Sequence, residues 1–270
     1  MTLNEAIKIL SDAGVDSPSH DAEELFCHFG GYSKSTLYLM NRIESDSPRL
    51  IEAINRRAAR EPLQYIIGRA YFYRECYKVT PDCLIPRFDT EILVDYAVNN
   101  LGDGAVILDL CTGSGCVAIS TLNNTNNSTA TAVDISPSAL ALAGENALMN
   151  GVQDRLTLLL RDVINQKVEG KFNAILSNPP YVTNSAYENL SREIYFEPKL
   201  AFVGGEDGGD FYRSITTLYR DSLLDGGFIA YEIGYDQADL LRKIAKDNDM
   251  SCEIIKDYSQ NDRVAVLRRK

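Results

Sequence analysis

Histidines and basic residues are scarce in this chain of 270 residues. Its two histidines, His20 and His28, lie near the N-terminus, which argues against a Ser-His-Asp or Cys-His mechanism in the long C-terminal part. The 27 lysines and arginines do not balance the 38 aspartates and glutamates, so the net charge is −11. That charge argues against a protein whose affinity comes from neutralising many nucleic-acid phosphates. We therefore expect no stable nucleic-acid binding.

Metal-binding cysteine patterns and long apolar runs are also missing. The six cysteines include no C-x-x-C pair, and with two histidines they offer no well-spaced set of four zinc ligands. No run of 18 apolar residues is present, so we expect no transmembrane helix and no membrane association. The opening MTLNEAIKILSDAG lacks the apolar stretch of a signal peptide. These features predict a cytoplasmic protein with reduced thiols and no metal.

The first sixty residues carry apolar side chains at helical spacing, starting at Leu3. Further helices are expected over 19–29, after Ser33 as a cap, and from Ser47-Pro48, where Pro suits a first helical turn. This pattern predicts a bundle of about four helices, and β-branched and aromatic residues then predict a hairpin over 66–80. The expected domains are a helical domain, a hairpin linker and a large α/β domain, at residues 1–62, 63–85 and 86–270.

From residue 89 onward, helical segments alternate with short apolar runs. Strands are expected, in chain order, over 105–109, 129–134, 156–160, 172–176, 228–233, 252–255 and 263–267. Strands that alternate with helices predict an α/β fold with an open, mostly parallel sheet. The final helix–strand–strand order predicts an antiparallel edge.

Three strand ends carry signals for a nucleoside-type cofactor. The turn D-L-C-T-G-S-G at 109–115 follows the first strand, and its glycines let the backbone approach a ligand at the start of a helix. Asp134 ends the next strand and can accept both hydroxyls of a ribose, while Asp162 follows the third strand and can meet an adenine amine. Each signal has a plain structural alternative: a tight turn, a helix-start acid or a solvated loop acid. Taken in order, the three predict a nucleoside-type ligand.

The fourth strand runs directly into the loop N-P-P-Y at 178–181. Its two prolines lack N–H donors and stiffen the loop. Asn178 supplies a side-chain carbonyl, Pro179 a backbone carbonyl, and Tyr181 a flat ring face. Such a loop suits a planar group bearing NH2, whose nitrogen lone pair can be drawn toward an electrophilic methyl. The structural alternative is a Pro-Pro turn with a buried tyrosine.

These motifs resemble the S-adenosylmethionine-dependent methyltransferases that modify planar nitrogens through an N-P-P-Y loop. More narrowly, the chain is similar to the peptide chain release factor glutamine N5-methyltransferase family (PrmC/HemK). The similarity covers nearly the whole chain. The I-P-R-x-D-T-E stretch before the cofactor turn and the G-G-E-D-G run after the N-P-P-Y loop are more specific than N-P-P-Y itself, which adenine-N6 enzymes share. The matching stretches are LIPRFDTE at 84–91, LDLCTGSG at 108–115, AVD at 132–134, SNPPYV at 177–182, FEP at 196–198 and GGEDGGDFY at 204–212.

The resemblance implies a seven-stranded Rossmann-like class I methyltransferase sheet that binds S-adenosylmethionine. It implies catalytic roles for Asn178, Pro179 and Tyr181, which with Pro180 would also bind the glutamine of a Gly-Gly-Gln loop in a release factor. The N-terminal helices would help to dock that release factor. The implied cofactor contacts are Cys111, Thr112, Gly113, Ser114 and Gly115 for the methionine part, Asp134 for the ribose, Asp162 and Val163 for the adenine, and in addition Asp109 and Asn178.

Four residues of this chain need comment against the family pattern. Arg87 and Glu91 would order the wall near the cofactor, or would simply be helix-start charges. Phe88 stands where the family usually has proline, which could alter the rigidity of that wall. Cys111 stands where the family usually has glycine. A Cβ is tolerated there if φ is negative.

Other functions stay open on the sequence alone. A ribosomal-protein glutamine methyltransferase and an adenine-N6 methyltransferase of DNA or RNA are the enzymatic alternatives. An adenine enzyme must flip its base out or take a single strand, normally through a basic channel, which the acidic balance disfavours. The non-enzymatic alternative is a binding module or activator subunit, against which the intact N-P-P-Y and cofactor turn argue. We expect a monomer.

Overall fold

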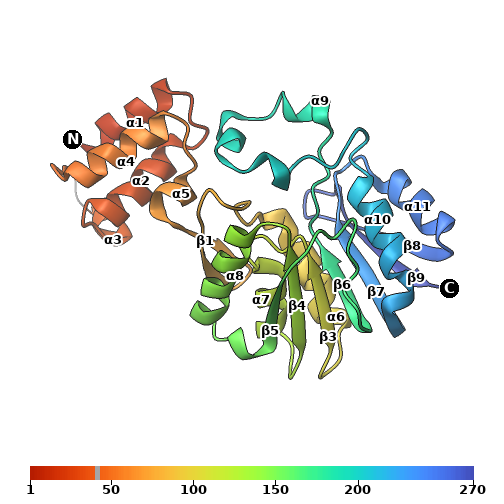
Figure 1. Ribbon diagram of the computed structural model, residues 1–270. Coiled ribbons are helices and arrows are strands. Elements are labelled where there is room, and N and C mark those ends of the chain that lie inside the picture. Colours follow the sequence, from red (N-terminus) through yellow and green to blue (C-terminus); the bar gives the residue numbers. More distant parts are fainter. Residues whose placement is uncertain (40–42) are drawn as a thin grey trace. The chain divides into compact units, whose positions relative to one another are not determined.

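The computed structural model describes residues 1–39 and 43–270, and its contacts divide the chain into two compact units (Figure 1). The first unit comprises Met1–Arg69 together with Ser191–Phe196. The second comprises Ala70–Leu190 and Glu197–Lys270. Among the described residues, no helix is long and apolar enough to cross a membrane.

The first unit is a helical bundle, as the sequence predicts. Its helices are α1 (Leu3–Asp12), α2 (Pro18–Phe29), α3 (Lys34–Leu39), α4 (Pro48–Ala58) and α5 (Leu63–Ile67). Their apolar faces form one core around Leu10, Leu25, Phe26, Leu50 and Ile54, all of which are buried. Helix α5 is one helix more than the sequence predicts, and it occupies part of the segment that we assigned to the hairpin linker.

Local side-chain caps explain where two of these helices begin. At α1, the Thr2 side chain accepts a hydrogen bond from the Glu5 N–H, and the Glu5 carboxylate accepts one from the Thr2 N–H. At α3, Oγ of Ser33 accepts from the Thr36 N–H at 3.1 Å, which confirms the predicted cap. These contacts satisfy N–H groups that have no partner inside a helix.

The second unit opens with the predicted hairpin and then builds a seven-stranded sheet (Figure 1). The hairpin strands are β1 (Arg69–Phe72) and β2 (Glu75–Lys78). The sheet strands are β3 (Val106–Leu110), β4 (Thr129–Asp134), β5 (Leu156–Leu160), β6 (Phe172–Ser177), β7 (Leu223–Glu232), β8 (Met250–Lys256) and β9 (Asp262–Arg269). Their order is β5-β4-β3-β6-β7-β9-β8, with antiparallel pairing only at β7–β9 and β9–β8. The mostly parallel sheet with an antiparallel edge is thus confirmed.

Helices separate most of these strands along the chain. They are α6 (Glu91–Asn100), α7 (Cys116–Asn123), α8 (Pro137–Met149), α9 (Asn184–Tyr187), α10 (Asp210–Tyr219) and α11 (Ala238–Asp247). Short 3-10 turns are η1 (Phe88–Thr90), η2 (Gln153–Arg155), η3 (Arg192–Phe196), η4 (Lys199–Ala201) and η5 (Arg220–Ser222). The helix expected from residue 89 therefore begins as the 3-10 turn η1 and becomes α-helical at Glu91, and α10 is a helix that the sequence analysis did not predict.

Two apolar cores form on the two faces of the sheet. Successive residues of β3 alternate between them, because Ile107 belongs to one cluster and Leu108 to the other. The first cluster contains residues of α6, α7 and α8, and the second contains residues of α10 and α11. Both faces of the central strands are thus covered, as parallel sheets require.

The sheet order fixes where a ligand can bind. Strand β3 has β4 on one side and β6 on the other, because the chain runs outward from β3 to β4 and β5 and then crosses back to β6 on the other side of β3. The carboxyl ends of these strands lie together, since Leu110 pairs with both Val133 and Ser177. In open α/β sheets a crevice forms at such a switch point.

Candidate active site

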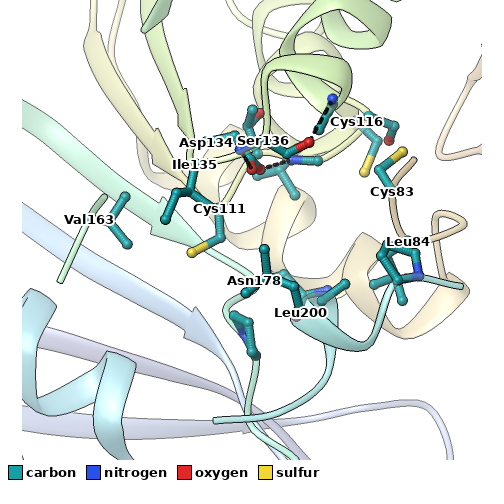
Figure 2. Close-up of a pocket in the computed structure, with 18 of the residues that line it drawn as sticks. Cys83, Leu84, Cys111, Cys116, Asp134, Ile135, Ser136, Val163, Asn178 and Leu200 are labelled. Carbon is teal, nitrogen blue, oxygen red and sulfur yellow. Dashed lines mark hydrogen bonds between the residues drawn. The ribbon is translucent and has the colours of Figure 1, made fainter. Parts of the chain in front are cut away.

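A cavity of about 280 Å³ lies at the carboxyl ends of β3, β4, β5 and β6 in the second unit (Figure 2). Nine of the thirteen predicted site residues line it: Cys111, Thr112, Gly113, Ser114, Asp134, Asp162, Val163, Asn178 and Pro180. The other four are close in sequence but are not among the lining residues: Asp109, Gly115, Pro179 and Tyr181. The sequence signals from four strand ends therefore converge on one cavity.

The turn between β3 and α7 has a backbone conformation that the sequence analysis did not anticipate. Cys111 has φ +60°, so the negative φ at which a Cβ is tolerated is not found at this position. Gly113 and Gly115 also have positive φ, at +54° and +82°. The chain reverses between strand and helix in so few residues that the left-handed conformation is needed three times. For a residue with a Cβ this conformation costs roughly 1–2 kcal/mol, which Gly would avoid.

Asp109 and Gly115 support this turn from inside the protein. The Asp109 carboxylate is buried and accepts hydrogen bonds from the Thr112 hydroxyl and from the Ala118 N–H. Burial raises the pKa of Asp109 to about 7, although these two bonds act against the rise. At Gly115, a Cβ would lie 2.9 Å from Cδ1 of Ile119 and 3.1 Å from Cβ of Ala143. Both residues thus hold the turn against α7, and neither lines the cavity.

Asp134 ends β4 at the rim of the cavity and accepts two backbone hydrogen bonds (Figure 2). Its Oδ2 accepts from the Gly113 N–H and its Oδ1 from the Ser136 N–H, both at 2.9 Å. Among the described residues it has no ion-pair partner, so each oxygen keeps a lone pair for a further donor. The carboxylate is fixed in place and chemically suited to accept two hydroxyl groups.

Asp162 and Val163 follow β5 and close another side of the cavity. Oδ1 of Asp162 accepts from the Ile164 N–H at 3.0 Å, and Oδ2 accepts from the Asn165 side-chain amide at 2.7 Å. Val163 is buried, whereas Ile135, which follows the neighbouring strand β4, is half exposed. Apolar side chains flanking a carboxylate suit a flat heterocycle with an exocyclic amine. The cavity therefore fits a nucleoside-type ligand.

Asn178 stands where β6 ends, and its hydrogen bond defines how its amide faces. Its Nδ2 donates to Oγ1 of Thr90 at 3.1 Å. Its Oδ1 receives no hydrogen bond from the described residues, and Asn178 lines the cavity (Figure 2). An acceptor without an internal donor is thereby available beside the cofactor turn, as N-P-P-Y predicted.

The rest of the N-P-P-Y loop is clamped by the segment after it. The Val182 N–H donates to the Phe202 carbonyl at 2.8 Å, and the Gly204 N–H donates to the Val182 carbonyl at 2.9 Å. Nε2 of Gln237 donates to the Tyr181 carbonyl at 3.0 Å. Gly208 lies so close that a Cβ there would be 2.2 Å from the same carbonyl oxygen. The glycine run at 204–209 thus packs directly on the backbone of the reacting loop.

Comparisons with known protein families identify the family to which this chain belongs. A family profile described as the PrmC N-terminal domain matches residues 2–68, and one described as the methyltransferase small domain matches residues 88–198. A release factor glutamine methyltransferase from Fusobacterium nucleatum is 36% identical over 98% of this chain and 77% of its own length. One from Thermodesulfovibrio yellowstonii is 39% identical over 92% of both chains. This chain belongs to the release factor glutamine methyltransferase family.

Solved structures of low sequence identity share the methyltransferase fold. A ribosomal protein L11 methylase from Lactobacillus delbrueckii has a TM-score of 0.52 at 19% identity, over 68% of this chain and 80% of that one. A methyltransferase from Pyrococcus furiosus has a TM-score of 0.53 at 22% identity, over 71% and 86%. These likenesses confirm the predicted class I methyltransferase fold for this family member.

Two residues that are hydrogen-bonded to the N-P-P-Y loop were missed by the sequence analysis. Thr90 is buried and receives the Asn178 amide, and its hydroxyl donates to the buried carboxylate of Glu232. The Tyr181 hydroxyl donates to the other oxygen of Glu232 at 3.1 Å. Burial raises the pKa of Glu232, against the effect of these two bonds. One sequence signal could have indicated Glu232: it is an acidic residue near the carboxyl end of the predicted strand 228–233, and that strand lies beside the strand that leads into the N-P-P-Y loop.

Arg87 and Glu91, the two wall residues, have different surroundings. Arg87 lines the cavity and pairs with Glu197, whose buried carboxylate also accepts the Ile85 N–H at 2.9 Å. Burial raises the pKa of Glu197, while Arg87 acts to lower it. Glu91 instead accepts the Tyr73 N–H at 2.7 Å, away from the cavity lining.

In the described part of the chain, no cluster of three or more His, Cys, Asp or Glu could hold a metal ion.

Proposed function

We propose that this protein transfers a methyl group from S-adenosylmethionine to the side-chain nitrogen of a glutamine in a peptide chain release factor. One observation carries the proposal: Asn178 lines the cavity at the end of β6, its Nδ2 donates to Thr90, and its Oδ1 has no donor among the described residues. Membership of the family supports the same reaction, because its named relatives are release factor glutamine methyltransferases.

The cofactor is the first part of this proposal. We infer that the turn at 111–115 takes the methionine part, that Asp134 takes the ribose hydroxyls, and that Asp162 and Val163 take the adenine. The free lone pairs of Asp134 and the apolar side chains beside it support this assignment. Asp109 and Gly115 contribute by holding the turn in shape. S-adenosylmethionine supplies an electrophilic methyl group when it is bound.

The acceptors of the N-P-P-Y loop make up the catalytic part. Oδ1 of Asn178 and the backbone carbonyl of Pro179 would each accept one hydrogen of the glutamine NH2 group. Holding both hydrogens directs the nitrogen lone pair out of conjugation with its carbonyl and toward the methyl carbon. The two acceptors would stabilise the positive charge that develops on nitrogen as the methyl carbon leaves the sulfonium sulfur, which becomes a neutral thioether, and one N–H proton would then be released to solvent. Pro180 and Tyr181 shape the pocket for the amide.

The partner and the location complete the proposal. The glutamine would be that of a Gly-Gly-Gln loop, and the helices of the first unit would help to dock the release factor. We also propose that the protein acts in the cytoplasm as a monomer and forms no stable complex with nucleic acid. The net charge of −11 supports the last point.

Two substitutions separate cofactor binding from chemistry. Asn178→Ala removes the acceptor and should lower the methyl-transfer rate about 100- to 1000-fold, a larger effect than any loss of S-adenosylmethionine affinity from the implied contact of Asn178 with the cofactor. Asp134→Ala should weaken cofactor binding by roughly 1–3 kcal/mol, through lost charge-assisted hydrogen bonds. Calorimetric titration and single-turnover assays on a purified release factor measure the two effects. Undiminished transfer by Asn178→Ala, or unchanged affinity in Asp134→Ala, would remove that residue from its assigned role.

A further inference from the structure

We propose that Glu232 and Thr90 are positioning residues that decide which way the Asn178 amide faces. Glu232 is not among the residues that line the cavity, whereas Thr90 is, and both would act through the N-P-P-Y loop. The inference rests on the proposed function, because an acceptor at Asn178 matters only if a substrate NH2 group meets it. It adds two residues, from two other parts of the chain, to the site that the N-P-P-Y motif defines.

We call the chain of hydrogen bonds from Glu232 through Thr90 to Asn178 the relay. It starts at the Glu232 carboxylate, at the end of β7. Strand β7 pairs with β6 in parallel, with Ser177 opposite Tyr231, so Glu232 lies beside the start of the N-P-P-Y loop. Its side chain is 2% exposed and has two described donors, the hydroxyls of Thr90 and Tyr181. A carboxylate can only accept hydrogen bonds. Both hydroxyl protons are therefore directed at Glu232.

The direction of the hydrogen bond from Thr90 to Glu232 also fixes the direction of the one between Thr90 and Asn178. A threonine hydroxyl has one proton, and here that proton goes to Glu232. The Thr90 oxygen can then only accept from Asn178, which lies 3.1 Å away, so the amide group facing it must be the NH2. Thr90 is 1% exposed, so water has little access to replace either bond. Oδ1 of Asn178 is consequently left on the side of the cavity.

The relay matters because the two ends of an asparagine amide have nearly the same shape. Rotating the Asn178 amide by half a turn would not create a steric clash, but it would present NH2 where the carbonyl now stands. Two donors would then face each other when a glutamine NH2 entered, and no acceptor would stabilise its developing charge. Packing cannot prevent that rotation, whereas a one-way hydrogen-bond chain can.

Glu232 also couples both ends of the N-P-P-Y loop. Through Thr90 it orients Asn178, the first residue, and through its other oxygen it holds the hydroxyl of Tyr181, the last residue. The two prolines between them limit the backbone freedom of the loop. One buried carboxylate thus fixes the orientation of the acceptor and of the ring together.

The orientation can be measured without any substrate. In the cofactor-bound protein, the Asn178 side-chain NH2 should show a nuclear Overhauser effect to the Thr90 methyl group. In Glu232→Gln, the Gln amide can donate to Thr90, which frees the Thr90 proton to point at Asn178 and favours the rotated amide. The effect should weaken or vanish in that variant. Its absence in the wild type, or its full persistence in Glu232→Gln, would overturn the relay whatever the enzyme methylates.

Kinetics then test whether the orientation serves the reaction. Thr90→Val removes the hydroxyl at nearly constant volume and should lower the methyl-transfer rate on a release factor about 10- to 100-fold, while Thr90→Ser keeps the hydroxyl and should restore it. Thr121→Val is the matched control, since Thr121 is also buried but donates to the Val117 carbonyl within α7. Cofactor affinity should be unchanged in all three variants.

A double substitution distinguishes this relay from a general loss of structure. With Asn178→Ala already present, Thr90→Val should lower the rate no further, because the residue it orients is gone. Additive losses, or equal rates for wild type and Thr90→Val, would contradict the positioning role. Failure of the wild type to methylate a release factor would refute the proposed function and with it the catalytic use of the relay. The amide orientation would still be tested by the nuclear Overhauser effect.

Discussion

Three carboxylates near the cavity have different partners, and the partners decide what each can do. Asp109 is buried and accepts from Thr112 and Ala118, so it serves the turn. Asp134 accepts two backbone N–H groups at the rim and keeps lone pairs for a ligand. Glu232 is buried and accepts two hydroxyls, which makes it a fixed point for the N-P-P-Y loop. We therefore propose that the same chemical group has a structural, a binding and a positioning use within one site.

Cys111 allows a residue-scale test of the turn. At ordinary positions Ala is at least as stable as Gly, but at φ +60° the order should reverse. We expect Cys111→Gly to be more stable than Cys111→Ala by about 1 kcal/mol. Both variants remove the thiol, so the comparison isolates the backbone strain. Urea unfolding of the two proteins measures the difference, and a more stable Ala variant would mean that the turn does not hold this φ in solution.

The sequence predicted site residues well where their role follows from a strand end. Asp134 and Asn178 were predicted in that way, and both line the cavity. The conformation of Cys111 was not predictable, because a positive φ depends on how short the turn is and not on the residue type. Thr90 and Glu232 are 142 residues apart, and no local pattern relates two such positions. Their contact depends on the packing of α6, which directly follows Thr90, against β7.

At the scale of elements, the reacting loop depends on the glycine run that follows it. The segment returns from the 3-10 turn η4 to α10 and crosses the backbone of residues 180–182. At Gly204, a Cβ would lie 2.3 Å from the Pro180 carbonyl oxygen, and at Gly208 one would lie 2.2 Å from that of Tyr181. These distances are too short for any side chain. The two glycines thus let one loop support the other.

Gly208 and Gly226 form a matched pair for testing this support. Both have a positive φ, +73° and +75°, but a Cβ at Gly226 would meet nothing within 4 Å. Gly208→Ala should displace the Tyr181 carbonyl and lower the methyl-transfer rate about 10- to 100-fold. Gly226→Ala should have the same backbone strain, about 1 kcal/mol in unfolding free energy, with the rate unchanged. Equal rates for the two variants would show that the close packing at Gly208 is not needed.

Most elements with a regular hydrophobic pattern were predicted. Strands β3 to β6 are apolar runs, and each was expected within a residue or two of its observed bounds. Helix α5 has five residues, too few for a helical repeat to stand out beside Pro62. Helix α10 was missed although its sequence carries the helical repeat, since its buried residues are Tyr212, Ile215, Thr216 and Tyr219.

At the scale of the whole molecule, the chain contributes a second segment to the first unit. Ser191–Phe196 belongs with the N-terminal helices, although both neighbouring stretches belong to the second unit. Within the first unit, Glu193 accepts from Arg60 at 2.6 Å and from Arg57 at 3.2 Å, and Arg57 also pairs with Asp21 at 2.7 Å. This network joins the late segment to helices α2 and α4.

Glu193 gives the fold a pH dependence of predictable sign. Burial opposes its ionisation, but the hydrogen bonds and charges of Arg60 and Arg57 outweigh burial and hold the pKa of Glu193 below its ordinary value near 4.5. Its stabilising contribution is therefore complete above that pH and is lost as the pH falls through the folded-state pKa. Glu193→Gln should cost about 1–3 kcal/mol at neutral pH, and the difference from wild type should shrink in acid.

A surface pair provides the control for that substitution. Asp12→Asn breaks an exposed pair with Lys8 in α1 and should change stability by less than about 0.5 kcal/mol at any pH. Thermal unfolding of the three proteins over a pH series measures both effects. A Glu193→Gln difference that stays constant into acid would show that the ionised carboxylate is not the source of the stability.

Methyl transfer from labelled S-adenosylmethionine is the measurement that tests the proposed activity on a release factor most directly. A purified release factor, ribosomal proteins and single-stranded DNA should be offered side by side, and peptide mass mapping should then locate the methyl group. We predict a single methyl on the side-chain nitrogen of the glutamine in the Gly-Gly-Gln loop of the release factor. Transfer to a ribosomal protein or to DNA, with the release factor left unlabelled, would contradict it.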